Sequence, residues 1–318
     1  MTAEALHADA TPRVVARQTC PVCGKPAGAV CLTKDEIAEE LRARDRFFAA
    51  RLARSFSRDA LRDLTSAVLG TPAAILRCAR CGVLIRDAAP GDEAFRDDRY
   101  DDEVLEALHE THARAFAAKE CDYRSLLPPG ARVIEIGSYV GGFLSAAAQW
   151  GWRAAGVDIG RDPVRFCRGR GLDVQRRRFE ACAFDPASAD AVFIWNCFEQ
   201  IAEPAEVLAA VRRVLCERGL LVIRVPDAEF YLRHTSLEVL AYNSLLGWPH
   251  RFGYDAASLR RLVQQHGFAF VRSLRRPAVR PLRDAMRAWA REEEARLIGD
   301  ANYGWIEATF SVQECQKV

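Results

Sequence analysis

Two cysteine pairs have the spacing of metal ligands. Cys20 and Cys23 are separated by two residues, as are Cys78 and Cys81, and a glycine follows each pair. Two such pairs supply four thiolates, which form a closed tetrahedral zinc site with zinc–sulfur bonds of about 2.3 Å. We therefore expect a structural zinc on these four cysteines, and the alternative is a set of unrelated reduced thiols. Cys31 is a spare thiol that could replace one ligand.

A glycine-containing turn is the second pattern that could do chemistry. Residues 133–143, VIEIGSYVGGF, predict a strand, a turn and a helix, which together let a ligand approach the backbone and a helix N-terminus. Tyr139 stands where a dinucleotide-binding fingerprint has its second glycine, and Glu135 precedes Gly137 by two residues. An acid is a poor neighbour for pyrophosphate but attracts an ammonium or sulfonium group. The predicted ligand is therefore cationic.

Asp158 ends the next predicted strand. A carboxylate at this place can accept hydrogen bonds from both hydroxyls of a ribose. The alternative is that Asp158 caps the N-terminus of the following helix.

Strands and helices alternate through the segment that contains these residues. We expect strands at residues 133–136, 154–158, 191–195 and 220–225, separated by helices at residues 143–150, 163–168 and 204–216. A helix at residues 255–266, a strand from Phe268, a charged helix at residues 281–298 and a strand at residues 305–312 complete the pattern. This alternation predicts a mostly parallel sheet with helices on both faces.

The segment between the cysteine pairs is long for a zinc site. Thr33 and Glu36 have the spacing of a capping box, and apolar residues recur at helical spacing from Ile37 to Leu52. A second helix is expected at residues 58–68. The insertion is thus predicted to be a helical hairpin, and the closure cost of such a loop grows only logarithmically with its length.

The 318 residues suit one catalytic domain and a small module. We expect a flexible lead-in at residues 1–18, a zinc-binding module at 19–86, a linker and helix at 87–130, and the main domain at 131–318. The 45 basic and 43 acidic residues leave a net charge of only +2, which argues against a binder of polyanions. The sequence has 11 cysteines, an odd number, and we recognise no signal peptide or membrane span in it. These features favour reduced thiols, and we therefore expect a cytoplasmic protein.

The run from Val133 to Pro226 resembles a class I S-adenosylmethionine-dependent methyltransferase. The resemblance rests on the order and spacing of VIEIGSYVGGFL, GWRAAGVDI and ADAVFIWNCFEQIAEPAEVLAAVRRVLCERGLLVIRVPD, and on the later segment WPHRFGYDAASLRRL. It implies a Rossmann-like, doubly wound α/β fold with a mostly parallel seven-stranded sheet. The cysteine pairs ahead of such a domain resemble the zinc-binding module of bacterial small-molecule and deoxysugar C-methyltransferases, although the inserted hairpin is unusual there.

The resemblance also implies which residues contact the cofactor, S-adenosylmethionine. Glu135 and Gly137 would meet its methionine end, and Asp158 would hold the ribose. Phe179 would stack on the adenine, with core packing as the alternative. The full expected set is Glu135, Gly137, Ser138, Tyr139, Gly141, Asp158, Ile159, Phe179, Glu180 and Asn196. Gly141 would let the backbone approach the cofactor.

The expected catalytic residues are His250, Tyr254 and Asn196. His250 is the first choice for a general base, against a surface or capping role. Glu199 and Asn196 are the alternatives, although Glu199 better suits a carboxylate at a helix N-terminus. The sequence pattern assigns no functional role to His109 or His112. Methyl transfer would proceed by in-line displacement onto a small-molecule acceptor of secondary metabolism or sugar modification.

Two other functions stay open. The chain could be an RNA methyltransferase whose zinc module docks the RNA, helped by Arg168, Arg170 and the arginines at 176–178, but acids balance these residues and no aromatic residues interleave with them. It could also be a methyltransferase-like scaffold that binds a partner without catalysis. The sequence does not predict the oligomeric state.

Overall fold

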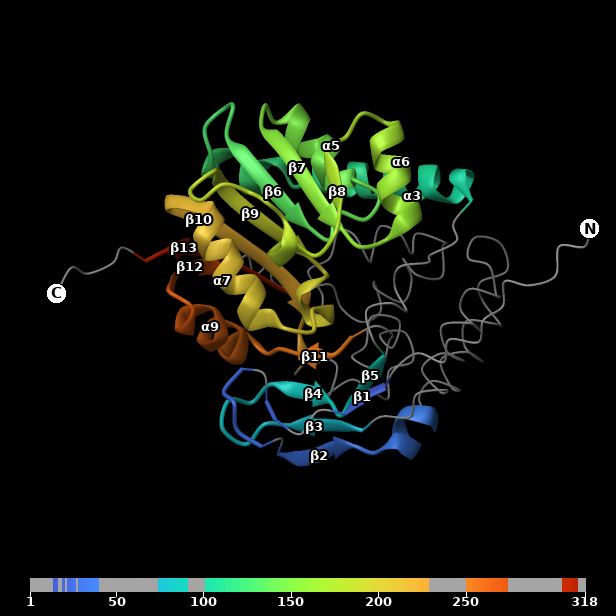
Figure 1. Ribbon diagram of the computed structural model, residues 1–318, viewed down its shortest axis with the longest axis vertical. Helices are drawn as coiled ribbons and strands as arrows, with labels where there is room; N and C mark the ends of the chain where they lie inside the picture. Colours follow the sequence, from blue (N-terminus) through green and yellow to red (C-terminus); the bar gives the residue numbers. More distant parts are fainter. Residues whose placement is uncertain are drawn as a thin grey trace, which may run out of the picture.

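A seven-stranded sheet forms the centre of the protein. The computed structural model describes residues 14–16, 19–20, 22–26, 28–39, 74–90, 101–228, 250–273 and 305–313. The strands lie in the order β12-β13-β10-β9-β6-β7-β8, and β6 to β10 run parallel to one another (Figure 1). Their bounds are β6 Arg132–Ile136, β7 Arg153–Asp158, β8 Val174–Arg176, β9 Ala189–Trp195, β10 Leu215–Pro226, β12 Phe268–Ser273 and β13 Trp305–Val312. The predicted α/β class is confirmed.

The last strand is inserted between two earlier ones. β13 pairs antiparallel with both β10 and β12, so the chain places β12 at the edge before it returns to fill the gap. The sequence predicted both strands from their alternating pattern. It did not predict their order, because the pattern shows which residues are buried and not which strand lies alongside.

Helices cover both faces of the sheet (Figure 1). α3 Asp102–Ala117, α5 Gly142–Gln149 and α6 Arg161–Gly169 cover one face, and α7 Pro204–Val214 and α9 Ala256–Gln265 cover the other. Side chains alternate between the two cores, since Val133 and Phe193 pack with the first group and Ile134 and Ile194 with the second. Strands buried on both faces are typical of parallel sheets.

The helix expected within residues 87–130 is interrupted at Lys119. α3 ends at Ala117, and α4 Glu120–Tyr123 is followed by the 3-10 helix η2 Arg124–Leu126. The break directs Lys119 toward β13, where its Nζ lies 2.8 Å from Glu307 Oε2, and the Tyr123 hydroxyl donates to the other oxygen of the same carboxylate. All three side chains are buried, so these polar contacts hold α4 against the sheet.

A small antiparallel sheet combines residues from distant parts of the sequence. Its strands are β2 Ala29–Leu32, β3 Ile75–Arg77, β4 Leu84–Arg86 and β11 Phe252–Gly253, in the order β11-β4-β3-β2. In Figure 1 this sheet lies below the large one, and β11 lies between them. Phe252 pairs with Ile85, and both side chains belong to the same core as α7 and α9. The expected N-terminal module therefore contains a strand from the main domain, and its boundaries stay a prediction.

Two segments expected to be a lead-in and a linker pair with each other. β1 Val14–Ala16 forms a two-stranded sheet with β5 Ala88–Pro90. Each strand has three residues, too few for a recognisable alternation, so the sequence analysis missed both. The predicted capping box is confirmed, because Thr33 N donates to Glu36 Oε2 and Glu36 N donates to Thr33 Oγ1 at the start of a helix at residues 34–39.

The second helix of the expected hairpin, at residues 58–68, and the charged helix at 281–298 lie outside the described residues. Within the described ranges, every helix is too short or too polar to cross a membrane.

Candidate active site and cysteine cluster

The glycine turn after β6 needs left-handed backbone at three positions. Gly137, Tyr139 and Gly141 have φ values of 76°, 45° and 73°. A Cβ added at Gly137 would lie 2.6 Å from Cys197 Sγ, so only glycine fits there. A Cβ at Gly141 would lie 2.5 Å from Leu172 Cδ1. This glycine therefore packs closely against the segment after α6, and the expected approach of a ligand to its backbone stays a prediction.

Tyr139 occupies a position that favours glycine. A left-handed conformation costs a non-glycine residue about 1–2 kcal/mol. Two contacts hold it there, since its amide donates to Asp158 Oδ2 at 2.8 Å and its ring centroid lies 5.8 Å from that of His112. Tyr139, which stands in place of the second glycine of the fingerprint, thus keeps the backbone shape of the turn and adds an aromatic ring beside it.

Two carboxylates lie close together beside this turn. Glu135 is 3% exposed, and its Oε2 accepts no hydrogen bond from a described residue. Burial and the charge of Asp158 raise the pKa of Glu135 well above its usual value. Burial also raises the pKa of Asp158, although the amides of Gly160 and Tyr139 donate to it and oppose the rise.

A cation fits this pair of acids. Among the described residues, no lysine, arginine or histidine forms an ion pair with Glu135 or Asp158, and buried carboxylates without a countercharge are costly. Asp158 is not the N-cap of α6, because that position is Gly160 and no side chain caps it. The carboxyl ends of β6 and β7 therefore offer an unfilled acceptor to a cationic group, in agreement with the sequence analysis.

Helix α3 closes over the turn through two histidines that the sequence analysis set aside. His109 Nδ1 donates to Val140 O at 2.7 Å, and His112 packs its ring on Tyr139. A Cβ added at Gly142 would lie 2.5 Å from His112 Cβ, so the two helices are in close contact. The available signal was the i, i+3 spacing, which places both histidines on one face of a helix.

Asn196 follows β9 at the same edge of the sheet. Its φ is 51°, and its amide donates to Arg224 O at 2.9 Å. Gln200 Nε2 donates to its carbonyl, which fixes the backbone. The buried Asn196 Oδ1 accepts no hydrogen bond from the described part of the chain, so it can accept one from a ligand.

Glu199 and His250 form a buried pair beside Asn196. Glu199 lies in the 3-10 helix η4 Phe198–Gln200, and its Oε1 is 3.4 Å from His250 Nε2. The two side chains are 1% and 13% exposed. Burial raises the pKa of Glu199 to about 8, and the charge of Arg224 opposes the rise. The pair can therefore share one proton near neutral pH.

This geometry changes the interpretation of Glu199. The sequence analysis favoured a carboxylate at a helix N-terminus, and Glu199 does lie in the first turn of η4, but its carboxylate also faces His250. The structure brings the expected base and one of its alternatives together as partners.

Two expected site residues lie in the core. Tyr254 has no exposed surface, and its ring packs 5.5 Å from that of Phe198 and 6.2 Å from that of Phe252. Phe179 begins the 3-10 helix η3 Phe179–Ala181, is 3% exposed and packs on Phe184. In this structure Phe179 packs in the core, which was the alternative to stacking on the adenine. Side chains buried in this way do not reach a ligand in this conformation, so both functional roles stay predictions.

Of the remaining expected cofactor residues, Ile159 and Glu180 have polar partners within the fold, whereas the buried Ser138 Oγ has no hydrogen-bond partner among the described residues. Ser138 is buried against Gly156, whose added Cβ would lie 2.8 Å from Ser138 Cβ. The Ile159 carbonyl accepts from Arg176 Nε at 3.4 Å. Glu180 lies 3.9 Å from Arg178. Their contacts with a cofactor stay predictions.

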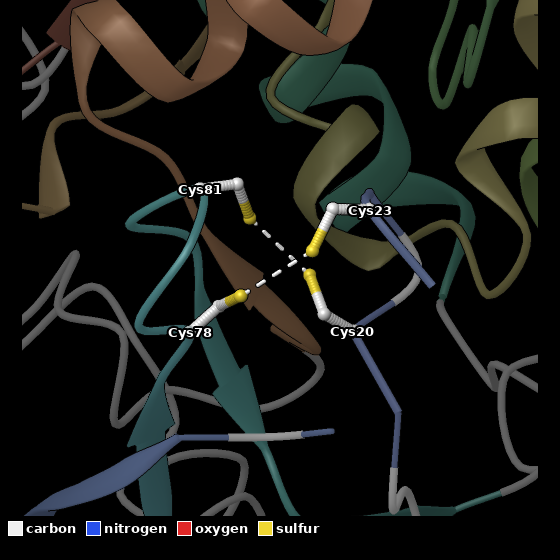
Figure 2. A group of neighbouring side chains, drawn as sticks. All are labelled: Cys20, Cys23, Cys78 and Cys81. Carbon is white, nitrogen blue, oxygen red and sulfur yellow. Dashed lines mark hydrogen bonds between the residues drawn. The ribbon is translucent and has the colours of Figure 1, made fainter. Parts of the chain in front are cut away.

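The four expected metal ligands converge on one point. Figure 2 shows Cys20 and Cys23 directed at Cys78 and Cys81, which come from the turn between β3 and β4. The sulfur atoms lie within 4.8 Å of one another, with Cys20 Sγ 3.3 Å from Cys81 Sγ and Cys23 Sγ 3.5 Å from Cys78 Sγ. Cys31 lies apart from the cluster on β2.

The turns of the cluster have the shape that thiolate ligands need. Gly24 and Gly82 have φ values of 66° and 79°, and their amides donate to the carbonyls of Cys20 and Cys78. Burial raises the pKa of Cys20 to about 11. For Cys78, burial acts in the same direction, but the amides of Cys81 and Arg80 lower the pKa to about 7. A regular tetrahedron with zinc–sulfur bonds of about 2.3 Å has sulfur separations of about 3.8 Å, so this donor set fits the metal.

Comparison with known proteins decides the family. A family model described as a methyltransferase domain matches residues 98–273, which is more than half of the chain. The chain belongs to this methyltransferase family. The ubiquinone biosynthesis O-methyltransferase of Hahella chejuensis is 34% identical over 100 residues, which cover 29% of this enzyme and 42% of that protein. The match thus spans less than half of the relative's length.

Solved structures agree with the fold of the methyltransferase. Phosphoethanolamine N-methyltransferase 2 of Haemonchus contortus, in complex with S-adenosylmethionine, superposes with a TM-score of 0.50 and 15% identity over 73% of this chain and 63% of that one. A methyltransferase of Thermotoga maritima has a TM-score of 0.46 and 17% identity over 67% and 97% of the two chains. The chain therefore carries a methyltransferase domain with a Rossmann-like sheet.

Gly137 gives a direct test of the turn geometry. Gly130 is a matched control, because it has a φ of 80° but nothing within 4 Å of an added Cβ. We expect Gly130→Ala to lower the free energy of unfolding by about 1 kcal/mol, through backbone strain alone. Gly137→Ala should lower it by about 3 kcal/mol, because the methyl group also collides with Cys197. Urea unfolding measures both, and equal losses would contradict the described contact.

Proposed function

We propose that the enzyme methylates a small-molecule acceptor whose reacting atom loses a proton to His250. The observation that carries the proposal is the buried Glu199–His250 pair at the carboxyl edge of the sheet. This is the edge at which open α/β sheets bind their ligands. A histidine paired with a carboxylate has the form of a general base, which a methyl acceptor needs only when it must lose a proton.

The cofactor would lie across the ends of β6, β7 and β9. Glu135 would face the cationic part of S-adenosylmethionine, and Asp158 would accept from the ribose hydroxyls with its remaining lone pairs. Asn196 Oδ1 offers one more acceptor. The support is that these buried polar atoms lie in one place and that a cation fits the two acids.

Each residue then has a separate task. The cofactor supplies a methyl group on a sulfonium, which leaves as a neutral thioether. Glu199 holds the His250 imidazole and accepts a share of its proton, and His250 removes the proton of the acceptor. Helix α3, with His109 and His112 against the turn, excludes water from one side of the site.

The arginines of the RNA alternative have partners within the fold. Arg170 lies 2.5 Å from Glu106, Arg168 donates to the Val174 carbonyl, and Arg177 donates to the Ala181 carbonyl. The acid paired with Arg170 lowers the net positive charge that this group of arginines offers to phosphates. A base with 13% exposure also suits a small acceptor better than a nucleotide within a folded RNA.

We further propose that the four-cysteine cluster binds one structural zinc ion. Its support is the donor set, the sulfur separations and the two left-handed glycine turns. Four thiolates leave no open coordination position, so this metal would stabilise β3 and β4 rather than take part in methyl transfer.

Binding of the cofactor is the first test. Asp158→Ala should weaken S-adenosylmethionine binding at least about 10-fold, since a buried hydrogen bond to a charged group contributes about 1.5–3 kcal/mol. Asp190→Ala is the matched control, because Asp190 binds the Arg132 amide at the opposite end of the same sheet. Calorimetry measures both. Absence of binding by the unmodified enzyme would favour the non-catalytic scaffold.

The class of acceptor can be tested without knowing its identity. The enzyme is incubated with radiolabelled S-adenosylmethionine and either a low-molecular-weight cell filtrate or total RNA. We expect label in the filtrate products and loss of this label in His250→Gln. Label that enters only RNA, in a salt-sensitive manner, would reverse the assignment.

The pH dependence follows from the Glu199–His250 pair. The base form appears when the pair loses its shared proton, so kcat/KM should rise with pH through a midpoint near 8. In Glu199→Gln the carboxylate no longer holds this proton, and the rise should move toward the ordinary histidine value of about 6.5. An unchanged profile in that variant would exclude Glu199 as the partner of the base.

The metal content tests the zinc proposal. Mass spectrometry under native conditions should find one zinc per chain, lost in Cys78→Ser but retained in Cys31→Ser. The first variant should also unfold at a lower urea concentration, because metal binding contributes to folding. A folded protein that lacks metal, and in which all four cysteines react with a thiol reagent, would contradict the proposal.

A further inference from the structure

A buried arginine of the small sheet holds the backbone of the proposed base. Arg86 ends β4, five per cent of its surface is exposed, and its Nε donates to His250 O at 2.9 Å. Its own amide donates to Arg251 O at 3.0 Å. One residue of the small sheet therefore makes two hydrogen bonds to consecutive residues of the segment that carries the imidazole.

The same segment is fixed from the opposite side by η4. Arg251 N donates to Glu199 O at 2.9 Å, and the His250 imidazole lies against the Glu199 carboxylate. Beyond it, Phe252 and Gly253 pair with Ile85 and Leu84. His250 is thus held between β4, which supplies Arg86, and η4, which supplies Glu199.

We propose that Arg86 is a positioning residue, which keeps the His250 imidazole on Glu199 by fixing the His250 carbonyl. The inference rests on the proposed role of His250 as the base. It gives β4 of the small sheet a task at the proposed acceptor site.

Arginine suits this task better than lysine. Its planar guanidinium has donors in fixed directions, and it tolerates burial while it remains charged. Burial lowers the pKa of Arg86 to about 10, which still leaves it cationic at neutral pH. A lysine at this position would keep the charge but lose the fixed Nε–H that meets the carbonyl.

The charged groups around the pair come from three elements and from the segment that carries His250 itself. Among the described residues they are Glu199 on η4, Arg86 on β4, Arg224 on β10 and Arg251 next to His250 itself. Arg86→Lys leaves all of these charges in place. A change in the titration of His250 in this variant therefore reports geometry and not lost charge.

The test uses the intact enzyme and needs no acceptor. The imidazole signals of His250 are followed by NMR against pH, and they are identified by their loss in His250→Gln. In Arg86→Lys and in Arg86→Gln we expect the imidazole to move away from the Glu199 carboxylate, so that the midpoint of the Arg86→Lys titration falls by about one pH unit. Arg261→Lys is the matched control, because Arg261 also donates to a carbonyl of the small sheet, that of Cys81, but does not contact His250.

Either of two results would overturn the proposal. One is an unchanged His250 titration in Arg86→Lys when Glu199→Gln does change it, and the other is an equal change in Arg261→Lys. If neither Arg86 variant folds, the rate of hydrogen exchange at the Arg86 Nε–H in the unmodified enzyme tests the proposal. A buried hydrogen bond to the His250 carbonyl requires slow exchange with solvent, and fast exchange would refute it. Failure of the proposed function would show separately, as a methyl transfer that does not depend on His250.

Discussion

The backbone pairing of β4 with β11 is the constraint on which the rest of this structure depends. β4 follows the second cysteine turn, and β11 follows His250, so these few hydrogen bonds connect the cysteine cluster to the candidate active site. The side chains on both sides of the pairing enter one continuous core with α7 and α9. The described part of the N-terminal cysteine region therefore packs directly against the large domain.

Two carboxylates that have no basic partner among the described residues indicate where a cationic ligand would bind. Glu135 and Asp158 lie side by side at the ends of β6 and β7 and repel each other, which a cationic cofactor would relieve. Glu199 and His250 lie farther along the same edge and can exchange a proton with an acceptor. Under the proposed function, the sheet would bind the cationic cofactor next to the residues that remove the proton of the acceptor, which are the two requirements for methyl transfer from a sulfonium to a protonated acceptor.

Local patterns in the sequence predicted the parts of this site that depend on neighbours in the chain. These local features are the spacing of the cysteines, the turn at Gly137 and the position of Asp158 after a strand. The missed contacts join distant residues: His109 with Val140, Glu199 with His250, and Arg86 with both His250 and Arg251. The sequence does not predict these contacts, because each depends on which elements pack together, although the i, i+3 spacing does place His109 on the same helix face as His112. The contacts of Arg86 also depend on a strand, β11, of only two residues. The insertion of β13 between β10 and β12 was missed for the same reason.

Amide hydrogen exchange with and without metal tests the central claim, that the cysteine cluster and the candidate active site form one cooperative unit. Removal of the metal with a chelator should deprotect β3 and β4 and, through their pairing, the amides of Arg251 and of β11 at Phe252 and Gly253 to a similar extent. Control amides in β7, on the far side of the large sheet, should keep their protection. Loss of protection confined to β2, β3 and β4, with β11 unchanged, would contradict the account.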